Sequence, residues 1–191
     1  MERGILMKVS IIGATGYAGA ELLRILHNHP QAEVVHLTSE SHTGEAIAAI
    51  YPHLRGLYKQ VLMSMKDIEK IGADSDFVFI GLPAGHAMEV GKALENTPVR
   101  IIDLGADYRF RDTDVYEHWY KVKHTHKNAE RVYGLAELYR GQIRDAKIIG
   151  NAGCYTTASI LALAPLAKNH LIDVNTIIVD AKSGVSGAGR S

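Results

Sequence analysis

The feature that most constrains the fold is a regular alternation of short β-branched runs with helical patterns. The runs lie at residues 8–12, 33–37, 76–80, 100–103, 147–150 and 176–181. Helical patterns separate them at residues 17–29, 64–72 and 84–96, and another begins at residue 154. Strands that alternate with helices are typical of parallel sheets with crossover connections. We therefore predict an α/β, Rossmann-like fold, a mostly parallel sheet with helices on both faces, followed by the start of a second α+β domain.

The charge balance and the cysteine count limit the classes of partner and compartment. Lys and Arg number 21, and Asp and Glu also number 21, so the formal net charge is zero. Nucleic acid and anionic lipid need a cationic surface, so we expect neither as a partner. One cysteine cannot form an intrachain disulfide, no signal peptide is evident, and no apolar run approaches the roughly 18 residues of a membrane span. A cytoplasmic protein is the expectation.

A glycine turn follows the first predicted strand. In GATGYAG the glycines are Gly13, Gly16 and Gly19, a G-x-x-G-x-x-G spacing that differs from the commonest dinucleotide fingerprint. The physical demands are similar: a tight turn, close approach to a pyrophosphate, and helix N-terminal N–H groups that face the anion. A turn that binds nothing is the alternative. The order of strand, turn, helix and strand favours nucleotide binding.

The segment after the second strand, LTSESHTGE, bears on the choice of cofactor. Thr38, Ser39, Ser41 and His42 could donate hydrogen bonds to a 2′-phosphate, whereas an acidic residue such as Glu40 could hold a ribose hydroxyl. No Lys or Arg lies nearby in the sequence. The residues alone leave NADP and NAD open.

A second glycine-containing turn follows the strand at residues 76–80. In GLPAGHA, Gly81 and Pro83 are candidate cofactor contacts, because open α/β sheets bind ligands at the carboxyl ends of their strands. An ordinary helix start with proline in its first turn is the alternative.

The only cysteine of the chain, Cys154, lies at the start of a predicted helix in GNAGCYTTAS. Unpaired N–H groups and the helix dipole favour the reactive thiolate there, and Gly150 and Gly153 leave room for a substrate carbonyl. A buried structural cysteine is the alternative. A nucleophilic thiol beside a dinucleotide implies thioester or thiohemiacetal chemistry coupled to hydride transfer.

Five motifs together resemble one enzyme family. They are GATGYAGAEL, IDLGADYR (102–109), YGLAEL (133–138), GNAGCYTT (150–157) and KSGVSGAGR (182–190). Over residues 7–191 the chain resembles N-acetyl-gamma-glutamyl-phosphate reductase, an enzyme of arginine biosynthesis. The sister family, aspartate-semialdehyde dehydrogenase, shares the plan but typically has Asn where this chain has Gly153. The resemblance implies NADPH-dependent reduction of the acyl phosphate N-acetyl-glutamyl 5-phosphate to the semialdehyde by a homo-oligomer.

The resemblance also implies roles for single residues. Cys154 would attack the acyl phosphate, and NADPH would reduce the resulting thioester. It implies that the pyrophosphate is held by Gly13, Thr15, Gly16, Tyr17 and Gly19, and that the adenosine phosphate is held by Ser39 and Ser41. The substrate contacts it implies are Arg109, Glu137, Asn151, Ser183 and Gly184. For Arg109, a surface salt bridge is the alternative.

The domain boundaries follow from these motifs. We expect residues 1–7 to be a disordered extension, residues 8–150 to be the dinucleotide-binding domain, and residues 151–191 to begin a truncated catalytic and dimerisation domain. Within the first domain, residues 105–146 lack a clean period and are expected to form long functional loops and short helices. The family's catalytic histidine is expected beyond Ser191.

Several residues depart from the family pattern or could act otherwise. Ala136 and Ala152 stand where the family usually has proline, and Glu40 stands where Arg often occurs. His124 and His126 could form a metal pair on a strand, although we expect them to be solvated loop residues and predict no metal. A sibling enzyme for another acyl phosphate and a non-catalytic dinucleotide-binding module remain the alternative functions.

Overall fold

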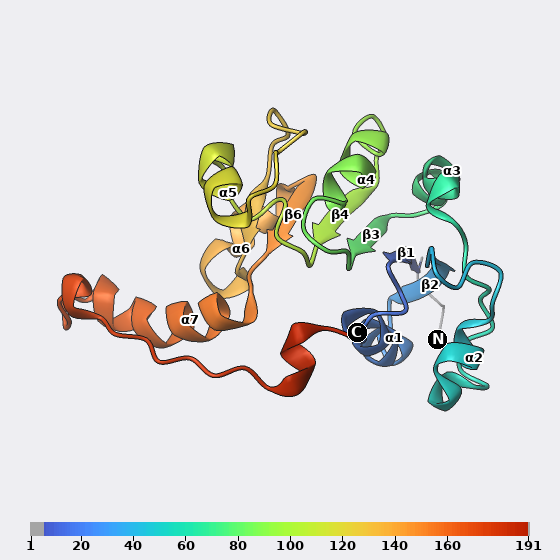
Figure 1. The fold of residues 1–191 in the computed structure, drawn as a ribbon, viewed down its shortest axis with the longest axis horizontal. Coiled ribbons are helices and arrows are strands. Elements are labelled where there is room, and N and C mark those ends of the chain that lie inside the picture. Colours follow the sequence, from blue (N-terminus) through green and yellow to red (C-terminus); the bar gives the residue numbers. More distant parts are fainter. Residues whose placement is uncertain (1–5, 191) are drawn as a thin grey trace.

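The computed structural model describes residues 6–190, which form a six-stranded, entirely parallel sheet with the order β2-β1-β3-β4-β6-β5 (Figure 1). The strands are β1 (Met7–Ile12), β2 (Ala32–Leu37), β3 (Phe77–Ile80), β4 (Arg100–Asp103), β5 (Val132–Gly134) and β6 (Ile148–Asn151). The α-helices are α1 (Tyr17–His27), α2 (Ile47–Ile50), α3 (Ile68–Ala73), α4 (Ala87–Ala93), α5 (Thr113–Tyr120), α6 (Ala136–Asp145) and α7 (Cys154–Lys168). Four short 3-10 helices are η1 (Pro52–Leu54), η2 (Met65–Asp67), η3 (Val174–Thr176) and η4 (Val185–Ala188). The predicted Rossmann-like fold is confirmed.

Helices cover both faces of the sheet. Successive side chains of a strand point to opposite faces, so neighbouring residues of one strand pack against different helices. Ile11 of β1 belongs to a buried cluster with residues of α1, β2 and α2, whereas the next residue, Ile12, belongs to a second cluster with residues of α3 and α4. Both isoleucines are completely buried. β1 is buried on both faces from Val9 to Ile12, and Ser10 is the polar residue within this run.

Two features differ from the sequence expectations. β1 begins at Met7, whose N–H donates to the carbonyl of Gln31, so this residue belongs to the sheet and not to an N-terminal extension. The rest of the predicted extension, apart from Leu6, lies outside the described residues. The region expected to hold only loops and short helices also contains β5, which pairs in parallel with β6.

The strand predicted at residues 176–181 is wrong. η3 ends at Thr176, and the residues from there to Lys182 form neither helix nor strand. Ile178 is 93% exposed. A strand needs a neighbour for its N–H and C=O groups, and no described strand lies beside this segment. The β-branched composition alone therefore gave a false signal.

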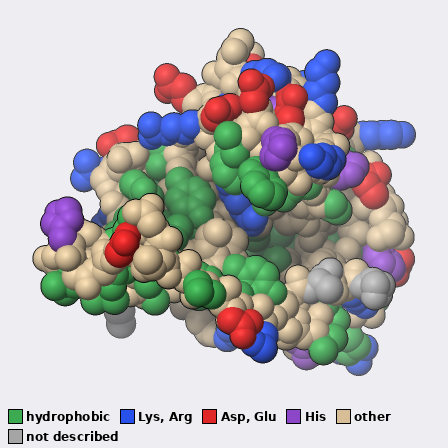
Figure 2. All heavy atoms as spheres, turned by 60° about the vertical axis from the view of Figure 1, so that its left-hand side comes forward, with side chains coloured by type: hydrophobic (Ala, Val, Ile, Leu, Met, Phe, Trp, Pro, Cys, Tyr) green, Lys and Arg blue, Asp and Glu red, His purple; other side chains and the backbone are tan. Residues whose placement is uncertain are grey.

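The C-terminal part of the chain leaves the sheet and then returns to it. α7 projects away from the sheet, and none of its described side chains is buried. The segment after it runs back toward α1 (Figure 1). Figure 2 shows this face of the molecule, with exposed hydrophobic side chains and a hollow in its middle. No helix among residues 6–190 has the length and apolar character needed to cross a membrane.

Candidate active site

The turn between β1 and α1 can be built only with glycine at two positions. Gly13 has a φ of +80°, and a Cβ on it would lie 2.5 Å from the carbonyl oxygen of Gly81. A Cβ on Gly19 would lie 2.5 Å from the carbonyl oxygen of Ala14. The first contact joins the two glycine turns, and the second lets α1 pack against the end of β1. Gly16 caps α1 without a side chain, so the helix N-terminal N–H groups remain free for an anion.

A cavity of about 1030 Å³ lies beside this turn, at the carboxyl ends of the parallel strands. Its lining includes eight of the nine predicted cofactor residues, namely Gly13, Thr15, Gly16, Tyr17, Ser39, Ser41, Gly81 and Pro83. The ninth, Gly19, does not line the cavity and acts through helix packing. A cavity of this size, with backbone N–H groups at one end and hydroxyls at the other, fits a dinucleotide.

Three hydroxyl groups gather at the β2 end of the cavity. The hydroxyl oxygens of Thr15 and Ser39 are 2.9 Å apart, and those of Ser39 and Ser41 are 3.4 Å apart. Thr38 does not join them, because its hydroxyl accepts a hydrogen bond from the N–H of Gly13 at 3.2 Å. Hydroxyls can reorient to donate, so this cluster can bind a phosphate oxygen.

The acidic residue among these hydroxyls already has partners. Oε1 of Glu40 accepts a hydrogen bond from the N–H of Met65 at 2.6 Å and a longer one from the hydroxyl of Ser64. The carboxylate therefore caps the start of η2 by accepting these hydrogen bonds, although Glu40 still lines the cavity. The sequence could not reveal this contact, because the partners are 24 and 25 residues away.

The thiol lies at the predicted place. Cys154 is the first residue of α7, directly after the N-cap Gly153, and it is exposed. A buried structural cysteine is thus not what the fold contains. Cys154 lines a second cavity of about 570 Å³ together with Ser183 and Gly184, two of the predicted substrate residues.

The two cavities have a common wall. Ser186 and Gly187, both in η4, line the large cavity and the thiol cavity. The segment predicted as a substrate loop therefore also closes one side of the cofactor cavity. This arrangement brings a cavity of dinucleotide size and the thiol cavity next to each other.

Arg109 and Asn151 are held together beside the start of α7. Nε of Arg109 donates to the carbonyl of Asn151 at 2.9 Å, and the two Nη atoms donate to the hydroxyl of Tyr120 and the carbonyl of Leu104. A Cβ on Gly153 would lie 3.2 Å from Nη1 of Arg109. Three oxygen atoms thus hold the guanidinium beside Gly153, the residue before Cys154. None of these oxygens belongs to a carboxylate, so the alternative of a surface salt bridge is not observed.

Two buried carboxylates shape the turn that carries Arg109. Asp103 accepts hydrogen bonds from the N–H groups of Gly105 at 2.8 Å and Tyr108 at 3.2 Å, and burial raises its pKa to about 6. Asp107 accepts from the hydroxyl of Tyr116 at 2.7 Å and from two N–H groups at the start of α4. Sequence reasoning missed both, although two aspartates just after an apolar strand, in IDLGAD, were a usable signal.

The histidine pair is not solvated, contrary to the expectation. His124 and His126 are 1% and 6% exposed. Nε2 of His124 lies 2.9 Å from the carbonyl oxygen of Asp107, and Nδ1 of His126 lies 2.8 Å from the hydroxyl of Tyr108. Burial lowers the pKa of His124. Both rings pack in the domain, and no group of three His, Cys, Asp or Glu side chains within residues 6–190 could hold a metal ion.

Glu137 is the predicted site residue that the structure does not bring to the others. It is exposed in the first turn of α6 and lines neither cavity. Its neighbour Ala136 starts that helix. Apart from Gly19, which lets α1 pack against β1, the remaining predicted residues line the two cavities or, like Arg109 and Asn151, lie beside the thiol.

Comparison with protein families agrees with this geometry. The family model of the semialdehyde dehydrogenase NAD-binding domain matches residues 8–146, and that of the semialdehyde dehydrogenase dimerisation domain matches residues 154–191. The chain belongs to the semialdehyde dehydrogenase family. The predicted dinucleotide-binding character of the first domain is therefore confirmed at the level of the family.

Curated relatives confirm the resemblance inferred from the motifs. The chain is 53% identical over 186 residues to the N-acetyl-gamma-glutamyl-phosphate reductase of Pelotomaculum thermopropionicum, which covers 96% of this chain and 53% of the relative. It is 50% identical over 187 residues to the enzyme of the same name from Moorella thermoacetica, and this match covers 97% of this chain and 54% of that relative. The chain thus spans about half the length of the curated relatives it matches.

Solved structures share the fold. Aspartate semialdehyde dehydrogenase with NADP from Candida albicans gives a TM-score of 0.61 at 18% identity, over 86% of this chain and 47% of that one. Aspartate semialdehyde dehydrogenase II complexed with ASA from Vibrio cholerae gives a TM-score of 0.59 at 17% identity, over 85% of this chain and 47% of that one. At these identities the likeness concerns the fold alone.

Proposed function

We propose that this chain is the cofactor-binding and thiol-bearing part of an NADPH-dependent N-acetyl-gamma-glutamyl-phosphate reductase. The reaction reduces N-acetyl-glutamyl 5-phosphate to N-acetyl-glutamate 5-semialdehyde and releases phosphate, a step of arginine biosynthesis. The observation that carries the proposal is the wall formed by Ser186 and Gly187, which separates a dinucleotide-sized cavity from the cavity of the only thiol. Relatives of that name, matched over nearly the whole chain, support the choice of substrate.

The chemistry of the chain begins at Cys154. Its sulfur attacks the carbonyl carbon of the acyl phosphate, the bond from that carbon to the phosphate oxygen breaks, and phosphate leaves with the electron pair, so that a thioester remains. Cys154 is exposed at the first turn of α7, so its sulfur is accessible to the substrate. N–H groups of the same turn can stabilise the oxyanion that forms during the attack. The adjacent guanidinium of Arg109 provides positive charge for the anionic substrate.

NADPH, when bound, supplies the hydride that converts the thioester into the semialdehyde and returns the thiolate. Gly13 and Gly16 would hold its pyrophosphate through the turn and the start of α1. Thr15, Ser39 and Ser41 would hold the phosphate of the adenosine, and Gly81 with Pro83 would flank the other end. NAD is the alternative cofactor, since Glu40 lies on the same side of the cavity.

Several further properties belong to the same proposal. Residues 8–150 form the dinucleotide-binding domain, and residues 151–191 begin the catalytic and dimerisation domain, whose remainder holds the acid/base histidine. The apolar and unburied α7 is the element through which that domain would assemble, so the complete protein is a homo-oligomer. We place the protein in the cytoplasm.

Alkylation of Cys154 distinguishes this proposal from its alternatives. Iodoacetamide should modify the thiol rapidly at neutral pH, because Cys154 is exposed and lines an open cavity at the start of α7. An inert thiol would favour a non-catalytic dinucleotide-binding module. A reactive thiol combined with turnover of aspartyl phosphate, and none of N-acetyl-glutamyl 5-phosphate, would favour a sibling enzyme.

A further inference from the structure

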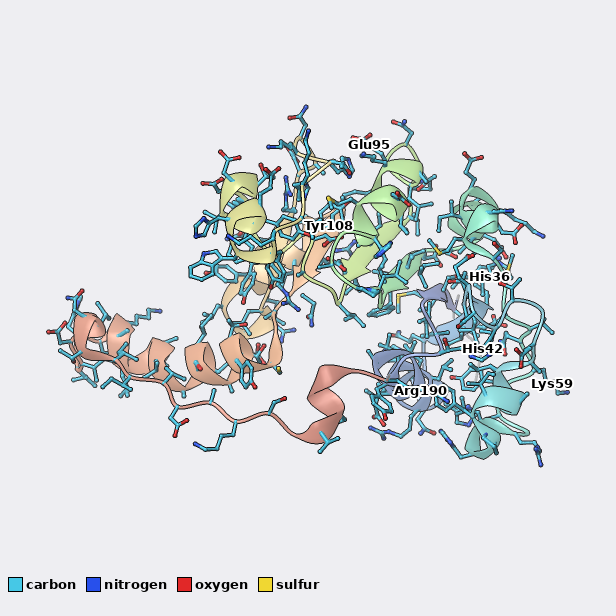
Figure 3. All side chains as sticks on the ribbon, in the orientation of Figure 1. His36, His42, Lys59, Glu95, Tyr108 and Arg190 are labelled. Carbon is cyan, nitrogen blue, oxygen red and sulfur yellow. The ribbon has the colours of Figure 1, made fainter. Side chains whose placement is uncertain are left out.

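The C-terminal segment brings one basic side chain into the cofactor cavity. Among the described residues that line it, Arg190 is the only Lys or Arg. Glu40 brings a negative charge, and the ring of His42 is occupied by the carboxylate of Glu45 at 3.0 Å. Figure 3 shows that Arg190 reaches over α1 on the same side of the molecule as His42. The sequence after β2 contains no such cation.

The guanidinium of Arg190 is held on the β2 side of the glycine turn. Its Nη1 donates to the carbonyl of Thr15 at 3.3 Å, and its central carbon lies 5.0 Å from the centre of the Tyr51 ring. The hydroxyl of Tyr51 donates to the same carbonyl at 2.7 Å. Tyr51 packs against the cluster of α1 and β2, not against the cluster of β3 and α4. Arg190 is therefore tied to the turn before α1 and to a ring of the α1 and β2 cluster.

Arg190 contacts the backbone of one residue of the hydroxyl cluster. Thr15, whose carbonyl Arg190 contacts, also carries the hydroxyl that lies 2.9 Å from that of Ser39. A guanidinium has five N–H donors, of which the carbonyl of Thr15 uses one. The remaining donors are available for an anion that rests on the hydroxyls of Thr15, Ser39 and Ser41.

We propose that Arg190 is a specificity-determining residue that binds the 2′-phosphate of NADP(H), together with the three hydroxyls. This inference rests on the proposed dinucleotide function. The 2′-phosphate is the group in question because Ser39 and Ser41 follow β2, where the adenosine ribose of a dinucleotide lies in this fold. The pyrophosphate lies at the N-terminus of α1 instead. The cation that the sequence after β2 lacks is thus supplied by a residue about 150 positions later.

The test is a calorimetric titration of the protein with NADP+ and NAD+, in wild type and Arg190→Gln. Charge-assisted hydrogen bonds are about twice as strong as neutral ones, so we expect NADP+ to bind roughly tenfold more weakly and NAD+ to change less than about twofold. The NADP+ affinity of Arg190→Lys should lie between those of wild type and Arg190→Gln, because lysine keeps the charge but loses the planar fork. Arg55→Gln is the matched control, since Arg55 is exposed in the same half and lines neither cavity.

A second pair of probes separates the two phosphate positions. Adenosine 2′,5′-bisphosphate should lose affinity in Arg190→Gln, whereas ADP, which lacks the 2′-phosphate, should not. Equal losses for both probes, or for NADP+ and NAD+, would overturn the inference in favour of a pyrophosphate contact or a structural role. Unchanged NADP+ binding in the variant would overturn it as well. A wild-type protein that binds neither dinucleotide would overturn the proposed function, and the inference with it.

Discussion

Nε of Arg109 donates a hydrogen bond to the carbonyl of Asn151 at 2.9 Å, which ties the turn after β4 to the end of β6. Cys154 starts α7 three residues after Asn151. The side chain of Arg109 therefore fixes the end of β6 next to the N-cap of α7 and places a positive charge beside the thiol. A flexible cation could not do this, because the same guanidinium also donates to Leu104 and Tyr120.

Replacement of Arg109 by lysine should therefore damage catalysis although the charge is kept. Lysine cannot reproduce a planar fork that serves three oxygens at once. We expect kcat/KM for the acyl phosphate to fall about 10- to 100-fold, while the affinity for NADPH stays within twofold. Steady-state kinetics and a cofactor titration check this. Kinetics equal to wild type would mean that Arg109 only supports the fold.

Removal of the thiol should separate binding from chemistry. In Cys154→Ser the hydroxyl lacks thiolate character and has no adjacent base in the motif, so reduction should be lost while NADPH binding is retained. Activity within tenfold of wild type would argue against a covalent intermediate. Cys154→Ala gives the matched variant without any nucleophile.

Gly150 should not tolerate a side chain. A Cβ there would lie 2.0 Å from the carbonyl oxygen of Tyr108, which is backbone and cannot rotate away. We expect Gly150→Ala to lower the free energy of unfolding by about 3 kcal/mol, within the range of severe strain. Gly141→Ala in α6 is the control, because nothing lies within 4 Å of its Cβ, and it should raise the free energy by up to about 1 kcal/mol. Urea unfolding of both variants tests this, and similar effects of the two would contradict it.

Asp103 should make stability depend on pH. Burial raises its pKa from 3.8 to about 6 in the folded protein, so the folded state binds the proton more tightly than the unfolded state. Its ionisation therefore lowers stability as the pH rises from about 4 to about 6, by at most about 3 kcal/mol, and has no further effect above that range.

Asp103→Asn removes this ionisation. The free energy of unfolding of the variant relative to wild type should increase as the pH rises from about 4 to 6. Asp145→Asn, at an exposed carboxylate, is the control and should leave the slope unchanged. Parallel curves for wild type and Asp103→Asn would show that this carboxyl titrates normally.

The sequence predicted the parts of the fold that depend on local pattern. The buried strand β3 is a continuous run of β-branched and aromatic residues, β1 ends in two adjacent isoleucines, and the turn at Gly13 needs a residue that tolerates positive φ. β5 was missed because three residues cannot establish a period. The false strand at 176–181 has the right composition but no neighbour, and strand pairing is not a local property.

The site was predicted in outline for the same reason. The positions of Cys154 and the glycine turns follow from local motifs, whereas the partners of the side chains do not. Glu40 reaches Met65, His126 reaches Tyr108, and Arg190 reaches Thr15 across 175 positions. Such contacts depend on which distant segments pack together in the fold. The local patterns of one sequence do not give this information.

Release of phosphate in the absence of NADPH tests the central claim most directly. The complete protein, mixed with N-acetyl-glutamyl 5-phosphate and no cofactor, should release one phosphate for each Cys154, because the acyl group remains on the sulfur. Cys154→Ser should release none above the spontaneous background. No release from wild type, or equal release from the serine variant, would contradict the account.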